Sequence, residues 1–230
     1  MSIAAMTWAL ASVIALQPPG DFHGDEVTAR NGEHWLALHV TPDGTARLRP
    51  ATLEVSAIED VILDEPGQRT GRRVGSAGMV DVRLYLRGTD LRAGRVEAGR
   101  IEPGPEGAVF NRRIGWKGRT VSLESHCETA APTDAGDPKV ACRVELVDGE
   151  RRQTLATMDG YRDENGRWVL GDDAEPQLIF AGDLDRDGRL DLILDTSNHY
   201  NMQRPTLFLS SRATGGAIVE VAGQHVSVGC

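Results

Sequence analysis

The sequence of 230 residues is poor in lysine and in aromatic residues, and it carries no excess of positive charge. Its two lysines are Lys117 and Lys139, aromatic residues make up 5%, and the formal net charge is -9. A protein that binds nucleic acid without sequence preference needs clustered Lys and Arg to contact the phosphates. The acidic balance therefore argues against a nucleic-acid partner.

Long hydrophobic runs are missing beyond the first residues. Residues 3–16 are mostly apolar, but such a run is short for a membrane-spanning helix, which takes about 20 residues. Its length and the small residues around Ala15 are typical of a secretory signal, although no Lys or Arg precedes it. A first core helix or a misassigned start codon is the alternative. We expect residues 1–17 to be a signal peptide, the protein to be secreted or periplasmic, and no transmembrane segment to follow.

Cysteine is also scarce, and the three cysteines show no zinc-type spacing. Cys127 ends a run of alternating residues, and Cys142 lies in a second such run after a turn-rich connector at 130–138. If the two runs pair as a hairpin, both sulfur atoms can lie on the same face. A disulfide between Cys127 and Cys142 would then close a loop of about 15 residues. Two reduced thiols are the alternative, and Cys230 could compete for either partner.

Helical periodicity is rare along the chain, whereas alternation of apolar and polar residues is common. Residues 35–40 and 80–86 are examples of predicted strands, whereas residues 53–62 leave helix and strand both open. The 26 glycines and 11 prolines are scattered, as expected for many short strands joined by turns. We therefore expect an all-β or mostly β fold, a sandwich or open barrel in two lobes.

A Pro- and Gly-rich stretch at 102–107 is the best candidate boundary between the lobes. It divides the chain into an N-terminal β lobe at 18–102 and a C-terminal β lobe at 109–230. No internal repeat of fixed period is present.

An acidic stretch at 183–191 reads D-x-D-x-D-G-x-x-D. Calcium takes six to eight oxygen ligands from carboxylates and backbone carbonyls on a tightly turned loop. The predicted ligands are the side chains of Asp183, Asp185, Asp187 and Asp191 and the carbonyl of Arg189. Apolar runs on both sides make the unit strand, calcium loop, strand, near the C-terminus. An acidic surface turn without metal is the alternative.

The loop is not an EF-hand, because its twelfth position is Leu194, where that motif has a bidentate Glu. Residues 182–195 instead resemble the calcium-loop segment of FG-GAP and VCBS-type repeats, which form β-propeller blades in integrin α chains and in many secreted bacterial proteins. The resemblance implies a metal site on the four aspartates. It does not imply a propeller, because a propeller needs several blades and the chain has one such loop.

The segment after the acidic loop carries three residues that are suited to ligand binding. His199, Tyr200 and Asn201 combine polar groups with an aromatic ring, and loops of this kind often bind ligands. We treat them as a weak candidate site for a protein or glycan ligand. Capping of the neighbouring sheet is the alternative.

These observations predict an exported calcium-binding β protein that acts as a binding or structural module. A secreted hydrolase with a carboxylate-based active site is the alternative. Such an enzyme needs two carboxyl groups that face each other across a cleft, and no sequence pattern marks such a pair. The nucleophile motif G-x-S-x-G is absent from the sequence.

Overall fold

The computed structural model of the chain describes residues 13–41, 44–104, 109–129, 140–174 and 176–229. Within these ranges the chain forms strands, one short 3₁₀ turn at Gly171–Asp173 and no α-helix. The all-β fold class predicted from the sequence is therefore confirmed. No helix in the described part of the chain has the length and apolar character that crossing a membrane requires.

The strands follow one another along the chain with mostly short connections. Their bounds are β1 Ala15–Gln17, β2 Gly20–Phe22, β3 His34–Val40, β4 Ala46–Thr52, β5 Glu54–Ile58, β6 Gly71–Gly75, β7 Val82–Arg87, β8 Gly94–Ala98, β9 Arg100–Pro103, β10 Asn111–Trp116, β11 Arg119–Thr129, β12 Val140–Asp148, β13 Arg151–Arg162, β14 Trp168–Leu170, β15 Gln177–Asp183, β16 Asp191–Asp195, β17 Met202–Gln203, β18 Pro205–Leu209, β19 Glu220–Gln224 and β20 Ser227–Val228.

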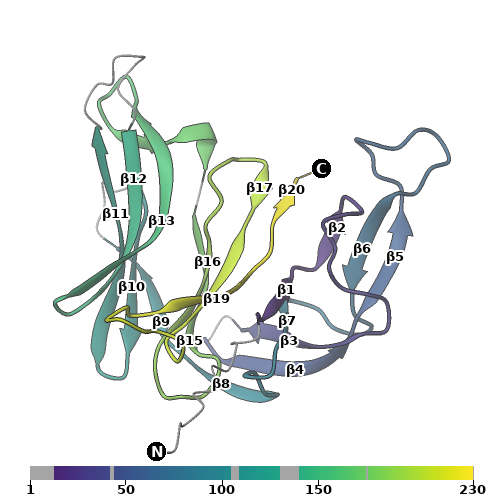
Figure 1. Ribbon diagram of the computed structural model, residues 1–230, viewed down its shortest axis with the longest axis horizontal. Coiled ribbons are helices and arrows are strands. Elements are labelled where there is room, and N and C mark those ends of the chain that lie inside the picture. Colours follow the sequence, from purple (N-terminus) through teal and green to yellow (C-terminus); the bar gives the residue numbers. More distant parts are fainter. Residues whose placement is uncertain (1–12, 42–43, 105–108, 130–139, 175, 230) are drawn as a thin grey trace, which may run out of the picture.

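The larger sheet, which we call the barrel sheet, is antiparallel and runs in the order β1-β7-β3-β4-β8-β15-β16-β18-β19 over the described residues. It curls until its two edge strands meet (Figure 1), and the N–H of Ile14 donates to the carbonyl of Ala222 at 2.8 Å. Gly223 makes this approach possible, because a Cβ there would overlap the Ile14 carbonyl oxygen. The barrel is thus nearly closed by the first and last strands of the sheet.

A second sheet stands beside the barrel and is curled into half of one (Figure 1). This half-barrel sheet runs in the order β14-β13-β12-β11-β10-β9, and the described residues also form a small sheet, β2-β6-β5, and a β17–β20 pair. The boundary expected at 102–107 covers the end of β9 and part of the connection to β10, inside the half-barrel sheet, and residues 105–108 lie outside the described ranges. The barrel sheet takes strands from both sides of that boundary.

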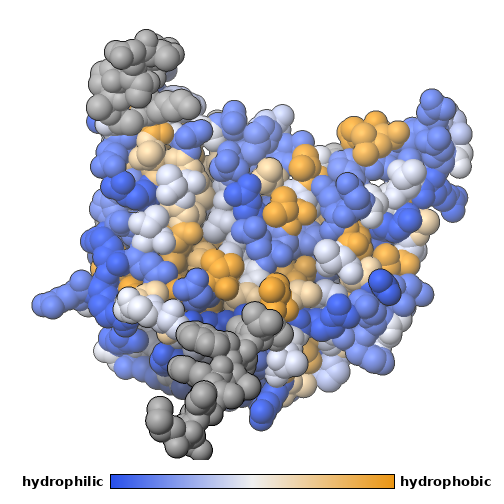
Figure 2. All heavy atoms as spheres, viewed as in Figure 1, coloured by the Kyte–Doolittle hydropathy of each residue, from blue (hydrophilic) through white to orange (hydrophobic). Residues whose placement is uncertain are grey.

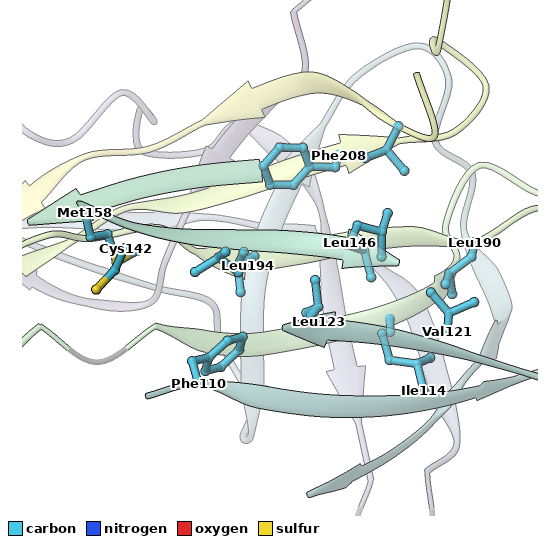
Figure 3. Packing of buried hydrophobic residues seen from close by; sticks show 14 of the residues in the cluster. Phe110, Ile114, Val121, Leu123, Cys142, Leu146, Met158, Leu190, Leu194 and Phe208 are labelled. Atoms are coloured by element: carbon cyan, nitrogen blue, oxygen red, sulfur yellow. The ribbon is translucent and has the colours of Figure 1, made fainter. Parts of the chain in front are cut away.

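Three apolar clusters hold the sheets together, and strands β15, β16 and β18 contribute to two of them from opposite faces. Leu192 and Leu194 face the half-barrel sheet, whereas Ile193 faces the barrel interior. The neighbouring β18 alternates in the same way, with Phe208 on one side and Leu207 on the other. Figure 3 shows the first cluster, in which Leu146 of β12 and Phe208 of β18 come from opposite sheets. We call these three strands the shared wall.

The third cluster lies between the barrel and the small sheet. Trp35 and Ala37 of β3 and Tyr85 of β7 pack against Phe22 and Val74 there. The intervening residues of β3 and β7 turn into the barrel, which is the period-two alternation predicted for both strands. The segment at 53–62, which the sequence left open between helix and strand, contains β5.

β1 comes from the end of the expected signal peptide. Ile14 and Leu16 are 0% and 1% exposed and belong to the barrel interior, and Leu16 is paired with Leu86 of β7. Removal of residues 1–17 as one piece would therefore take a strand and two core side chains from the barrel.

The loop between β5 and β6 carries an exposed apolar tip. Val61, Ile62 and Leu63 in the loop between β5 and β6 are 79%, 64% and 63% exposed, and a hydrophobic patch lies at this place in Figure 2. Asp60 anchors the loop at its start. Its Oδ1 accepts the N–H groups of Ile62 and Leu63 at 3.1 Å, and its Oδ2 is hydrogen-bonded to His23. The tip is therefore a fixed turn within the fold.

Cys127 and Cys142 lie directly opposite each other on β11 and β12 and form a disulfide. The predicted hairpin pairing and the predicted bridge are both confirmed. The expected turn at 130–138 and Cys230 lie outside the described residues. The bridge lies at the end of the first apolar cluster, where Cys142 is fully buried.

His225 lies where β1 meets the C-terminal part of the chain. It is 3% exposed, its ring meets Phe22 edge-on at 5.7 Å, and it has a hydrogen bond with the backbone of Leu16. Its Nε2 is buried and has no hydrogen-bond partner among the described residues. Burial lowers the pKa of His225 to about 4, because a charged imidazolium would lose its hydration there.

We expect loss of the disulfide to destabilise the protein. The two cysteines are 15 residues apart, and a bridge that closes a loop of that length stabilises by about 3 kcal/mol in the chain-entropy model. Urea unfolding should show a loss of this order in the Cys127→Ala, Cys142→Ala double variant. Reductant should produce a comparable loss in the parent protein and none in the double variant. An unchanged midpoint in the reduced parent would contradict the expectation.

We expect His225 to weaken the fold in acid. Its folded pKa lies below the unfolded value near 6.5, so the unfolded chain takes up the proton first, and stability falls as the pH drops from about 6.5 towards 4. The full loss is about 3 kcal/mol.

Urea unfolding near neutrality and near pH 5 should show a smaller acid-induced loss in His225→Leu than in the parent. The matched variant His34→Leu, at an exposed position of β3, should behave as the parent does. Parallel acid losses in parent and His225→Leu would show that His225 is not the responsible group.

Candidate metal centre

The acidic segment connects β15 to β16 and so joins two strands of the shared wall. Leu184 and Leu190 are 0% and 6% exposed, and they anchor both ends of the loop in the apolar clusters. Gly182 is paired with Asp191 at the base of the hairpin. The unit is therefore strand, loop, strand, and its base is rigid.

Within the loop, the aspartate side chains fold the backbone around themselves. Asp183 Oδ2 accepts the N–H of Gly188 at 2.9 Å, Asp185 Oδ1 accepts that of Asp187 at 3.2 Å, and Asp187 Oδ1 accepts that of Arg189 at 2.8 Å. The last two bonds are Asx-turns, in which Asp bonds the backbone two residues ahead. The spacing of alternate aspartates thus turns the chain tightly enough for their carboxylates to converge.

Two backbone positions complete the turn. Gly188 has φ of 86° and Arg186 has φ of 67°, both in the left-handed region that a residue without a side chain adopts most easily. The guanidinium of Arg186 donates to the carbonyls of Arg92 and Ala93 at 3.2 and 2.9 Å. These two bonds tie the middle of the loop to the segment before β8.

Three carboxylates come together in the loop. One carboxylate oxygen from each of Asp183, Asp185 and Asp187 lies within 4.8 Å of the other two. Asp183 is 7% exposed, and its Oδ1 is buried with no hydrogen-bond partner among the described residues. Burial raises the pKa of Asp183, and the charges of Asp187 and Asp185 raise it further. A buried, unpaired carboxylate oxygen is unfavourable unless a cation or a proton satisfies it.

Asp191, predicted as a fourth side-chain ligand, lies next to the group but is not part of it. Its Oδ2 accepts the N–H of Leu184 at 2.8 Å, and its Oδ1 accepts both the N–H and the hydroxyl of Ser210 at 2.9 and 3.0 Å. It is 0% exposed, and burial raises the pKa of Asp191 to about 7. These bonds fix the end of the loop to the end of β18.

Basic and hydroxyl groups contact the loop. The guanidinium of Arg189 pairs with Asp187 Oδ2 at 2.6 Å. The predicted ligand from this residue was its backbone carbonyl and not its side chain. Lys117 Nζ donates to the carbonyl of Gly188 at 2.7 Å. Ser211 donates its hydroxyl to Asp185 Oδ2.

The donor set determines the kind of ion that fits. All the grouped donors are carboxylate oxygens, which suit hard cations such as Ca²⁺, Mg²⁺ and Mn²⁺ rather than metals that select thiolate or imidazole. The unpaired Oδ1 of Asp183 supplies an acceptor that no protein group uses. The carboxylates of Asp183, Asp185 and Asp187 can therefore hold a metal ion.

The second candidate site, at His199, Tyr200 and Asn201, lies near the end of the β15–β16 hairpin that is opposite the acidic loop. His199 and Tyr200 line a groove of about 390 Å³ together with Gln177 and Asp195, which pair at the outer end of β15 and β16. Asn201 is not among the lining residues, and its carbonyl accepts the N–H of Gly229 at 2.7 Å.

The sequence did not indicate Ser210, Ser211 or Lys117 as parts of the loop. The two serines follow β18 and Lys117 lies between β10 and β11, so only the pairing of distant strands brings them here. No local pattern could have identified them.

Comparisons of the chain with protein-family models, with curated proteins and with solved structures each found no match.

Proposed function

We propose that the protein is an exported calcium-binding module, in which calcium orders the hairpin of β15 and β16 and the fold serves binding or structure rather than catalysis. The observation that carries this proposal is the buried, unpartnered Oδ1 of Asp183 inside a group of three carboxylates. The resemblance of residues 182–195 to FG-GAP and VCBS-type calcium loops supports the same conclusion.

Calcium suits this loop better than magnesium. Calcium accepts six to eight oxygens in irregular geometry, whereas magnesium requires a near-ideal octahedron and keeps several waters. Asp183, Asp185, Asp187 and the carbonyl of Arg189 would contribute to the shell, and waters would complete it. We assign Asp191 the role of holding the loop in shape, since it is not part of the carboxylate group and its fully buried oxygens accept from Leu184 and Ser210.

The expected effect of calcium is local order. Without a cation, three carboxylates at short range repel one another, by about 1 kcal/mol per pair at 4 Å even in bulk water. A cation removes this repulsion and pairs the buried oxygen of Asp183. Because the loop joins two strands of the shared wall, ordering it stabilises the packing of both clusters that the wall separates.

The carboxylate-based hydrolase receives less support. A general acid needs a pKa near the working pH and contact with substrate. The pKa of Asp191 is raised to about 7, but this residue is fully buried and bonded at both oxygens. It therefore cannot protonate a bound substrate without unfolding the loop.

Export is supported by two features. The apolar run at 3–16 resembles a secretory signal, and disulfides such as that of Cys127 and Cys142 persist in oxidising compartments. Because Ile14 and Leu16 belong to the barrel, we place the end of any removed leader before Ile14, and not after residue 17.

We expect calcium to raise the melting temperature of the full chain. An ion that binds the folded state alone stabilises it by RT ln(1 + [L]/Kd), about 2.7 kcal/mol at a hundredfold excess over Kd. Scanning calorimetry with calcium, magnesium or chelator should give the largest shift with calcium. Asp183→Asn and Asp185→Asn should each remove most of the shift, since each deletes a charged ligand.

Two variants serve as controls for this experiment. Asp159→Asn, at an exposed aspartate of β13, should keep the full calcium shift. Asp191→Asn should lower the melting temperature in calcium and in chelator alike, because its amide nitrogen cannot accept from Leu184 or Ser210. Equal melting temperatures of the parent in calcium and chelator would refute the calcium proposal.

We expect a C-terminally tagged full chain, expressed in a bacterium, to reach the periplasm or medium with its disulfide formed. N-terminal sequencing should find a start at or before Ile14, because a cut after residue 17 would remove β1. A variant that lacks residues 3–12 should stay in the cytoplasm. Recovery of chain beginning at Met1 from the cytoplasm alone would contradict export, and a start after Gln17 would contradict the role of β1.

A further inference from the structure

We propose that the groove at the outer end of the β15–β16 hairpin binds a neutral oligosaccharide, with Tyr200 as its aromatic platform. This inference deepens the binding role proposed above and rests on it. The groove measures about 390 Å³, within the range of roughly 300–1,000 Å³ that is usual for small-ligand sites. The lining residues that matter for binding are Arg83, Gln177, Asp195, His199, Tyr200 and Gln203.

The aromatic part of the groove is exposed yet fixed in place. Tyr200 is 72% exposed, and its ring stacks on that of His199 with centroids 4.6 Å apart and planes inclined by 27°. The N–H of Tyr200 donates to the carbonyl of Asp172 at 2.8 Å, and His199 Nδ1 accepts the N–H of Asn201 at 3.1 Å. A ring held rigidly in water loses little conformational freedom when a ligand stacks on it.

The polar part of the groove has unused hydrogen-bonding capacity. Among the described residues, the side chains of Arg83, Gln177 and Gln203 have no hydrogen bond or ion pair to the rest of the protein. Asp195 is held by its Oδ1, which accepts the N–H groups of Ser197 and Arg204 at 2.9 and 3.0 Å. Its Oδ2 accepts no hydrogen bond from the described residues and remains available as an acceptor.

The mixture of groups selects the ligand class. An apolar ligand would strip water from Arg83, Asp195 and the two glutamines without replacing its hydrogen bonds. Arg83 and Asp195 carry opposite charges, so a ligand with charge of either sign meets one repelling group beside one attracting group. A sugar hydroxyl can both donate and accept, so it satisfies the amides, the carboxylate and the guanidinium together, while the C–H face of a pyranose ring packs on Tyr200.

Titration calorimetry on the calcium-loaded full chain tests the inference. The probes are cellohexaose, laminarihexaose, mannohexaose and chitohexaose, each at millimolar concentration. At least one should bind, and Tyr200→Ala and Gln177→Ala should each weaken that sugar about tenfold or more, the equivalent of about 1.4 kcal/mol. The matched variant Tyr161→Ala, at a 46% exposed tyrosine of β13, should bind as the parent does.

The remaining outcomes separate this inference from the calcium proposal. Hexagalacturonate is anionic and the hexamer of glucosamine is cationic. Both should bind more weakly than the neutral sugar. Failure of all four neutral probes, tighter binding of a charged one, or equal loss in Tyr161→Ala would overturn the inference. Melting curves in calcium and chelator on the same samples report the metal site independently of the sugar result.

Discussion

Burial of both faces of the β15–β16–β18 wall is the constraint on which the rest of the structure depends. One face packs against the half-barrel sheet and the other fills the barrel, so the same strands belong to both cores. Strands that are buried on both faces consist of nearly continuous apolar residues, as β16 and β18 do. The acidic loop and the groove lie at opposite ends of a hairpin in this wall, which gives each of them a rigid base.

Local pattern was sufficient for the strands whose faces differ. β3 and β7 alternate between the barrel and the small sheet, and β11 and β12 place Cys127 opposite Cys142, as their period-two spacing predicted. β13 gives little sequence signal, because few of its residues are apolar and, of its side chains, that of Met158 alone is buried. The strand order could not be predicted either, because it depends on pairs such as Ala98 with Gly182, which are far apart in the sequence.

The carboxylate group of the acidic loop was predictable because its geometry is set locally. Alternate aspartates and one glycine determine the turns that bring Asp183, Asp185 and Asp187 together. The surroundings were not predictable, since Ser210 is brought to Asp191 by the pairing of β16 with β18. The groove was predictable only in part. The sequence indicated His199 and Tyr200, but nothing in it related them to Arg83 on β7.

Closure of the barrel by β1 and β19 also sets the order in which the chain can complete its fold. The bond from Ile14 to Ala222 joins the beginning of the described chain to its end, so it cannot form until residue 222 has left the ribosome. Contacts of such long sequence separation form late and slowly. Until then, the growing sheet has two open edges, at β1 and at β18, and unpaired strand edges are sites where β-proteins aggregate. A chain that stops short of residue 222 would retain such an edge permanently.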